Sequence, residues 1–351
     1  MTFDLLMKTK PLQKYFFFLI IATISCRGTT TFKRPDVSNI EVNVKIERFD
    51  QEFADLKPSE ILVKNNHWMD SYGEFYTNYI EDMLRVASSK DSQKFSQEVK
   101  YILEQKEFKD LNHAVQKKFP SLQKQEKDIA QALKYILYYF PEYKIPRLIS
   151  YVSGFAYQTP VGENYVGIGL DMFLGADSEF YPALVNSIPL YLSRRFTPEN
   201  ITPRVIEAIL REDILPISDR TTNTLHHMIY NGKILYAMDV LLENATDELK
   251  IGYTAEQMVW AKKYQADIWS WFLQENLLYS TDHNRIQKYF TEAPFTPELG
   301  ANNDSAPKLG SYIGWMIVRR YMDKHPDINL KQLFENEDAQ KILEDSKFKG
   351  N

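Results

Sequence analysis

The chain has 351 residues, of which 42 are Lys or Arg and 47 are Asp or Glu, so its formal net charge is −5 at pH 7. This mildly acidic balance argues against a nucleic-acid-binding protein and against a broad basic surface that attracts membranes. Hydrophobic residues make up 44% of the chain and aromatic residues 14%, which is ample for a packed core.

The N-terminal 25 residues have the pattern of an export signal. Three lysines precede an apolar run, and these are Lys8, Lys10 and Lys14. The run is shorter than the roughly 20 apolar residues that a membrane-spanning helix needs. The stretch Thr23-Ile24-Ser25-Cys26 resembles the lipobox of bacterial lipoproteins, although Thr23 stands where leucine is usual. We predict a lipoprotein signal peptide at residues 1–25, with Cys26 as the lipid attachment site. The alternative is a cleaved secretory signal with a chance cysteine.

Lipidation of Cys26 has consequences for the rest of the chain. It is the only cysteine, so no thiol remains for a disulfide, a cysteine-based metal site or a cysteine nucleophile. Residues 26–39 are predicted to be a lipid-anchored tether, followed by a single domain at residues 40–351. We expect the lipid, rather than protein charge, to attach the protein to a membrane.

The first elements of the domain are predicted from hydrophobic periodicity. Apolar residues alternate from Ile40 to Ile46, which predicts a half-buried strand within residues 41–49. Residues 59–88 and 93–140 have helical periodicity, and Pro141 is expected to end the second helical region.

A composition rich in β-forming residues then begins. Residues 147–157 and 165–171 are predicted to be strands, and the turn residues at 159–164 suggest that the two strands form a hairpin. After it the chain is predicted to be mostly helical. The expected helical features are a helix at 181–196, Thr-Pro helix starts at Thr197 and Thr202, a helix begun by a Thr254–Gln257 capping box and carrying aromatic residues to Phe272, and a helix at 309–322. The predicted fold class is α+β, mostly α-helical, with a small sheet packed on helices.

The segment that begins at Leu225 invites comparison with a zinc peptidase. The HExxH motif places two histidines at i and i+4 on one helix face, with a glutamate between them as general base. If His226 is the first histidine, His227 occupies the glutamate position and Tyr230 occupies the second histidine position. Adjacent helical residues point about 100° apart, so His226 and His227 cannot easily chelate one ion. We therefore expect no metal, no cofactor and no catalytic residue, and interpret the two histidines as a partly buried pair at a helix start.

Four stretches resemble the gliding-motility lipoprotein family GldB of the Bacteroidetes. They are Tyr165-Val166-Gly167-Ile168-Gly169-Leu170-Asp171-Met172-Phe173-Leu174-Gly175, Met228-Ile229-Tyr230-Asn231-Gly232-Lys233, Leu309-Gly310-Ser311-Tyr312-Ile313-Gly314-Trp315-Met316-Ile317-Val318-Arg319, and the signal that ends at Cys26. The resemblance implies a zincin-like core whose zinc motif has decayed. It also implies a part in gliding and in the type IX secretion machinery that gliding depends on, without implying a known reaction.

A ligand site remains possible where a peptidase cleft would lie. Its candidate residues are His226, His227, Tyr230, Lys233 and Asp171. The plainer interpretation of Asp171 is a cap for the turn that follows its strand. Gly232 suggests that another element packs closely against its helix, or that a peptide or glycan approaches the backbone there. Gly310 and Gly314 likewise suggest close helix packing in a soluble core.

Three functions follow from these observations. The first is a lipid-anchored, non-catalytic protein of the cell envelope, on the periplasmic side or in the outer membrane, whose partners are other gliding and secretion proteins. The second is an envelope zinc metallopeptidase. The third is a lipoprotein that binds a peptide or glycan in a vestigial protease cleft.

Overall fold

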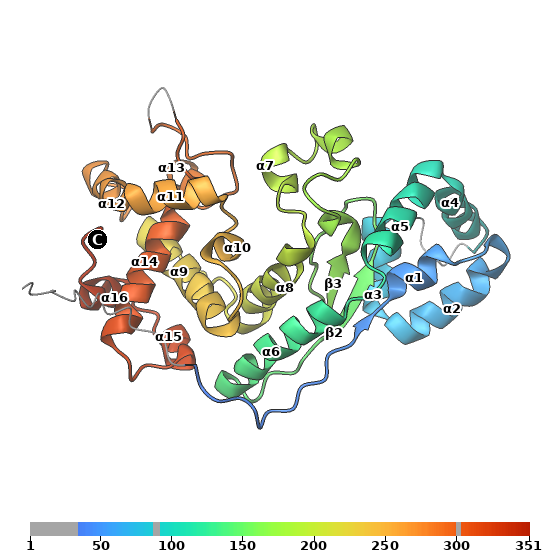
Figure 1. The fold of residues 1–351 in the computed structure, drawn as a ribbon, viewed down its shortest axis with the longest axis horizontal. Helices are drawn as coiled ribbons and strands as arrows, with labels where there is room; N and C mark the ends of the chain where they lie inside the picture. The colour runs from blue at the N-terminus through green and yellow to red at the C-terminus, as the bar shows by residue number, and fades with distance from the viewer. Residues whose placement is uncertain (1–33, 87–91, 300–302) are drawn as a thin grey trace, which may run out of the picture. The chain divides into compact units, whose positions relative to one another are not determined.

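A computed structural model describes residues 34–86, 92–299 and 303–351 (Figure 1). The predicted signal peptide, Cys26 and the first part of the tether lie outside these residues. Residues from Arg34 to Asn351 belong to one unit of contacts. In the part of the chain that the structure describes, no helix has the length and apolar character needed to cross a membrane.

The N-terminal half of the described chain is mainly helical, as its periodicity predicts. Its helices are α1 (Phe49–Ala54), α2 (Ile61–Tyr72), α3 (Glu74–Asn78), α4 (Ser92–Glu104), α5 (Lys106–Lys118) and α6 (Gln123–Tyr139). The region predicted as helical from residue 59 is interrupted at Gly73, whose φ of 53° ends α2 and begins α3. The helix α6 ends two residues before Pro141, as predicted.

The sheet has three strands in the order β1 (Ile46–Glu47), β2 (Arg147–Tyr151) and β3 (Tyr165–Gly169). Both neighbouring pairs are parallel, with Ile46 opposite Leu148 and Leu148 opposite Val166. The predicted strands are therefore in place, but the prediction that 147–157 and 165–171 form a hairpin is wrong. The first strand is also shorter than predicted, because only Ile46 and Glu47 of the alternating stretch pair with the sheet.

A different antiparallel pairing explains the hairpin-like pattern. Residues 158–162 run back along the free side of β3, where the Gly167 and Gly169 amides donate to the carbonyls of Pro160 (2.8 Å) and Gln158 (2.9 Å). Val161 and Val166 form an antiparallel bridge. The predicted turn residues thus supply one arm of the antiparallel pair themselves.

The C-terminal half contains α7 (Leu190–Ser193), α8 (Ile201–Ile209), α9 (Thr224–Leu241), α10 (Asp247–Ile251), α11 (Ala255–Lys263), α12 (Gln265–Gln274), α13 (His283–Ile286), α14 (Leu309–Lys324), α15 (Leu330–Glu335) and α16 (Ala339–Ser346). The capping box at Thr254 is present, and the predicted helix at 309–322 is α14.

Three helix predictions in this half need correction. The predicted helix 181–196 is a 3-10 helix at Tyr181–Leu184 followed by the four-residue α7, which begins after Pro189. Thr202 does not start a helix, because Thr202-Pro203 lies in the first turn of α8, where proline is tolerated. The helix predicted to continue to Phe272 is divided at Tyr264 into α11 and α12.

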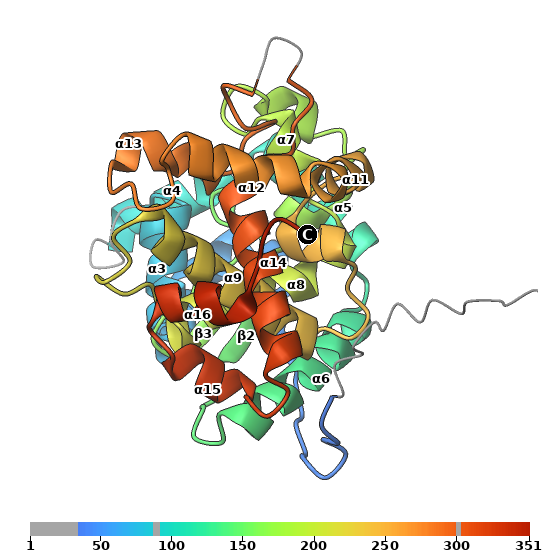
Figure 2. The ribbon, with the colours of Figure 1, turned by 90° about the vertical axis from the view of Figure 1, so that its left-hand side faces the viewer.

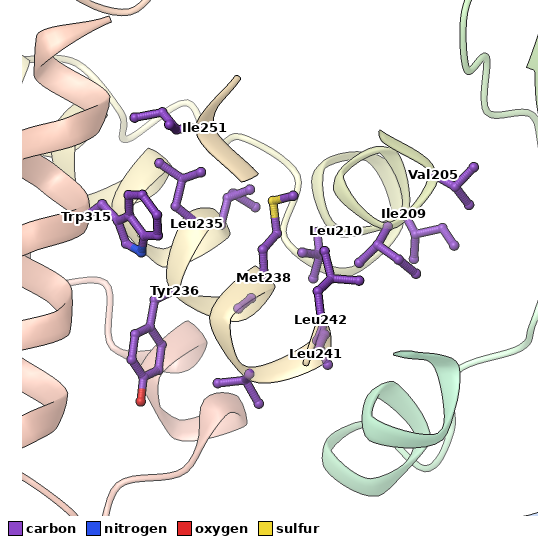
Figure 3. Packing of buried hydrophobic residues seen from close by; sticks show 14 of the residues in the cluster. Val205, Ile209, Leu210, Leu235, Tyr236, Met238, Leu241, Leu242, Ile251 and Trp315 are labelled. Atoms are coloured by element: carbon purple, nitrogen blue, oxygen red, sulfur yellow. The ribbon is translucent and has the colours of Figure 1, made fainter. Parts of the chain in front are cut away.

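The largest hydrophobic core joins the sheet to α6, α8, α9 and α14. Figure 3 shows its central part, where Leu210 lies near Met238 of α9 and near Leu242, which follows that helix. Trp315 of α14 is fully buried in the same cluster. A second, aromatic cluster surrounds Phe49, whose ring lies 5.1 Å from Trp68.

The helices α9 and α14 lie side by side and contact each other extensively (Figures 1 and 2). Gly232 of α9 faces Gly314 of α14, because a Cβ added at Gly232 would lie 2.3 Å from the Gly314 carbonyl oxygen. The predicted close packing at Gly232 and Gly314 is therefore confirmed. Gly310 is also closely packed, against Phe290 and the Tyr289 carbonyl.

Candidate functional site

The candidate residues at 226–233 lie in the first half of α9. Asn223 caps this helix, because its side-chain oxygen accepts a hydrogen bond of 2.9 Å from the His226 amide. His226 and His227 occupy the first turn, where both are partly buried. The N-cap fixes where the helix begins and therefore which way each histidine points.

Three of the candidates lie along one face of α9. Residues at i, i+4 and i+7 share a helix face, and His226, Tyr230 and Lys233 have this spacing. All three line a cavity of about 320 Å³. The opposite wall comes from the 215–221 loop and from Phe334, Glu337 and Ala339, near α15 and α16. These three side chains form one wall of this cavity, which we call the α9 cavity.

Lys233 is the most buried polar group of the α9 cavity, with 6% of the residue exposed. Its ammonium group donates to the carbonyls of Asn336 (2.6 Å) and Phe334 (3.4 Å). Burial lowers the Lys233 pKa to about 8, and the nearby Glu337 opposes that shift. Lys233 therefore ties the end of α15 to α9.

Tyr230 also contacts a cation. The Arg211 guanidinium lies 5.7 Å from the ring centroid, within the range of a cation–π interaction. Burial raises the Tyr230 pKa, and the Arg211 charge opposes that shift. The phenol is therefore neutral near pH 7, suited to hydrogen bonding and stacking.

His227 points away from the α9 cavity. Its ring lies 5.3 Å from the Phe290 ring, and burial lowers its pKa, helped by the nearby His283 and His226. The His226 Nδ1 instead lies 3.3 Å from the Thr222 amide nitrogen. Across residues 34–86, 92–299 and 303–351, no three His, Cys, Asp or Glu side chains are grouped so that they could hold a metal ion.

Asp171 lies elsewhere, in the 3-10 helix Leu170–Phe173 that follows β3. Its side chain is fully buried, and one carboxylate oxygen accepts from the amides of Phe155 (2.7 Å) and Ser153 (3.2 Å). The other oxygen has no hydrogen-bond partner among the described residues. Burial raises the Asp171 pKa to about 6, although the backbone hydrogen bonds oppose the shift. Asp171 thus holds the loop at 153–155 and does not line the α9 cavity.

Asp171 should make stability depend on pH. Its folded-state pKa of about 6 lies above the ordinary value of 3.8, so the folded protein holds this proton more tightly than the unfolded chain does. Its stabilising contribution is fully present below about pH 4 and is lost as pH rises through 6, a change of about 1–3 kcal/mol. Asparagine does not ionise, so Asp171→Asn should remove this component of the pH dependence. It still keeps an acceptor for the Phe155 amide. Urea unfolding between pH 4 and 7 measures it.

The matched control is Asp177→Asn, because Asp177 is exposed on the same segment. Its curve should follow that of the unmodified protein at every pH. If Asp171→Asn and Asp177→Asn give parallel curves, Asp171 does not carry the buried proton.

Sequence reasoning missed the residues that complete the α9 cavity. Phe334 and Glu337 lie about a hundred positions further along the chain, and no local pattern links them to α9. It also missed Arg211, although its charge next to a helix end is visible in the sequence.

The family model described as gliding motility protein GldB matches residues 30–350 of the chain. Neither the comparison with curated proteins nor the comparison with solved structures found a match.

Proposed function

Because the chain belongs to the GldB family of gliding motility proteins, we propose that it is a lipid-anchored, non-catalytic protein that supports gliding and the type IX secretion machinery. The observation that carries this proposal is the extent of the family match, which covers residues 30–350. The anchor is the lipid on Cys26, in the outer membrane or on the periplasmic side. The partners are other gliding and secretion proteins of the envelope.

The geometry of α9 supports a non-catalytic role. The helix positions that a zinc peptidase would use carry His227 and Tyr230, and these side chains contact Phe290 and Arg211. The Lys233 amine is occupied by backbone carbonyls. We propose that the fold is zincin-like and that the α9 cavity is the remnant of its substrate cleft.

Removing the lipid anchor tests the proposal directly. Cys26→Ala removes the thiol that receives the lipid, so the product should leave the membrane fraction and colony spreading should be lost. Deletion of the gene should abolish spreading and reduce the secretion of adhesins. Fractionation and spreading assays on agar measure these results.

A Ser25→Ala variant is the control, because it keeps a small residue before the cysteine and should remain anchored and active. If deletion leaves both spreading and adhesin secretion intact, the proposed function is wrong. If Cys26→Ala stays in the membrane fraction, the anchor is wrong but the family role is untouched.

A second candidate function is peptide or glycan binding in the α9 cavity. The observation that favours it is the presence of an aromatic ring and a buried amine, Tyr230 and Lys233, on one wall of that cavity. Tyr230→Ala should abolish such binding, whereas Tyr230→Phe keeps the stacking surface and should weaken it only partly. Binding to peptide and glycan arrays measures this, and unfolding of the Tyr230→Ala variant would instead assign the ring to the core.

The metallopeptidase alternative can be tested by its metal content. An active enzyme would contain stoichiometric zinc bound through His226, so metal analysis of the purified protein distinguishes it from both other functions.

A further inference from the structure

A second and larger cavity, of about 620 Å³, lies apart from the α9 cavity. Its walls are the loop at 155–161, residues of α7 and its C-terminal continuation to Phe196, and one face of α8 with the turn that follows. Two of the candidate residues lie just behind these walls. Asp171 holds the Phe155 amide, and Tyr230 supports Arg211. We call this space the arginine cavity.

Three arginines line the arginine cavity, and they share two carboxylates with a buried lysine. Glu207 bonds both Arg204 and Arg211, the latter at 3.0 Å. Glu292 bonds both Arg195 and Lys308, the latter at 2.6 Å. Four cations thus share two carboxylates in a partly buried region.

Other charged side chains nearby do not neutralise the excess of positive charge in this cluster. Arg194 adds a fifth cation, whose guanidinium donates to the Gly252 carbonyl (3.0 Å) and the Gln257 side chain (3.2 Å). Glu212 also lines the cavity but is exposed to solvent, where water screens its charge. The cluster therefore keeps a net positive charge.

The guanidinium groups also keep unused hydrogen-bond donors. The side chains of Arg195 and Arg204 are only 12% and 10% exposed. The Nε–H of each has no acceptor among the described residues. Both Nε atoms are covered by the protein, so an anion in the cavity would bind the exposed part of these guanidinium groups.

Burial and the neighbouring charges shift the pKa values of the carboxylates and of Lys308. Burial raises the Glu207 pKa, but Arg204 and Arg211 outweigh that effect and hold it at about 2. Burial lowers the Lys308 pKa to about 8, with Arg195 acting in the same direction against Glu292. Burial raises the Glu292 pKa, but Lys308 and Arg195 outweigh that effect and hold it at about 2. Both carboxylates are thus ionised near pH 7 and still do not balance the cations.

Apart from Gln158 and Thr159, the rest of the cavity lining is mainly apolar. Phe155, Val161, Met172, Leu192 and Phe196 lie on the walls opposite or beside the charged side chains. A cavity with an apolar wall and a few convergent charged groups is typical of small-molecule sites. Guanidinium groups recognise carboxylates and phosphates through directed N–H donors.

We propose that the arginine cavity binds a small organic anion, in which a carboxylate or phosphate group faces Arg195 and Arg204 and an apolar group faces Phe155 and Phe196. The ligand compensates the excess positive charge and supplies acceptors for the two guanidinium groups. This site is separate from the α9 cavity and does not depend on the role of the protein in gliding.

Phenyl phosphate and benzoate are suitable probes, because both are too hydrophilic to enter detergent micelles readily. The full chain, purified in a nonionic detergent, should bind at least one of them in calorimetric titrations, and comparison of the two shows which headgroup is preferred. Benzyl alcohol has no charge and inorganic phosphate has no apolar group, so each should bind at least about tenfold more weakly. Equal affinity for phenyl phosphate, benzyl alcohol and inorganic phosphate would overturn the proposal, as would binding of neither anion.

Two variants place the binding in this cavity. Arg195→Gln removes a charge and should weaken binding by about tenfold or more. Ala208→Phe, on the cavity face of α8, fills the space without removing a charged group and keeps the test informative if Arg195→Gln does not fold. Arg220→Gln is the control, because Arg220 is exposed beside the α9 cavity and its loss should change nothing. Unchanged binding in Ala208→Phe, or equal losses in Ala208→Phe and Arg220→Gln, would show that the anion binds elsewhere.

Discussion

Gly314→Ala should destabilise the protein by about 3 kcal/mol or more, or prevent folding, because α9 and α14 touch at this point. A Cβ at Gly314 would lie 1.8 Å from the Met228 carbonyl oxygen and 2.8 Å from the Met228 Cα. Both are backbone atoms of α9, so no side chain can move aside to relieve the overlap. The two helices would have to separate along the contact that buries Trp315.

The sign of this effect makes the experiment decisive. In an exposed helix interior, Gly→Ala stabilises by roughly 1 kcal/mol, so helix propensity and close packing predict opposite results. Gly232→Ala should behave like Gly314→Ala, since its Cβ would meet the Gly314 carbonyl. Lys324→Ala, at the exposed end of α14, should change the free energy of unfolding by less than about 0.5 kcal/mol. Urea unfolding followed by circular dichroism measures all three, and a more stable Gly314→Ala would mean that the helices are not in close contact.

These glycines show how far sequence reasoning reaches. A glycine inside a helical pattern indicates that something approaches closely, and this was correctly predicted for Gly232 and Gly314 separately. Nothing in either segment indicates that the two glycines meet. Periodicity describes one helix at a time, whereas the choice of a packing partner depends on the whole core.

The sheet shows the same division between local and long-range information. The β-forming composition located β2 and β3, but it could not decide which extended segment pairs with which. Two extended segments precede β3, and the one nearer in sequence, 158–162, takes the antiparallel position. Arg147–Tyr151 then pairs on the other side in parallel, which a hairpin pattern cannot reveal.

For the candidate residues of α9, helix geometry accounts for the direction of each side chain. His226, Tyr230 and Lys233 are spaced so that they lie on one face of α9. The 100° offset that argued against joint metal binding also accounts for His227, which lies against Phe290. Asp171 could not be placed relative to α9, because β3 and α9 are related only through the tertiary fold.

The sequence analysis did not predict the arginine cavity, although the spacing of some of its charged residues is visible in the sequence. Arg204, Glu207 and Arg211 are spaced by three and four residues, which places them on one helix face and allows Glu207 to bond both arginines. Arg195 lies just after the four-residue helix α7. Its actual role depends on Glu292, a residue from a distant loop.

A second contact between α9 and α14 is electrostatic and centres on Asp239. The Arg319 guanidinium donates two hydrogen bonds of 2.7 Å to its carboxylate. The Trp315 indole and the Lys250 ammonium donate to it at 2.8 Å each. Burial lowers the Arg319 pKa, but hydrogen bonds to Asp239 and Asp247 outweigh that effect and raise it overall. One carboxylate thus satisfies donors from α10 and α14.

Asp239→Ala should therefore destabilise the protein by about 3 kcal/mol, because it leaves two buried donors, from Trp315 and Lys250, and the partly buried Arg319 without this acceptor. The exposed i,i+4 pair of Lys124 and Asp128, at 3.0 Å, provides the matched control, and Asp128→Ala should cost less than about 0.5 kcal/mol. Unfolding in urea at pH 7 compares the two.

A double-mutant cycle of Asp239→Ala with Arg319→Ala separates the ion pair from the other contacts of each residue. We expect a coupling energy of about 1–3 kcal/mol. It should be smaller than the loss in Asp239→Ala alone, since Lys250 and Trp315 also lose their acceptor. Arg319 additionally bonds Asp247 at 2.8 Å, so Arg319→Ala should destabilise even when Asp239 is already absent. Equal, small effects of Asp239→Ala and Asp128→Ala would show that the Asp239 cluster is screened by water, leaving apolar packing and the Gly232–Gly314 contact to hold α14 on α9.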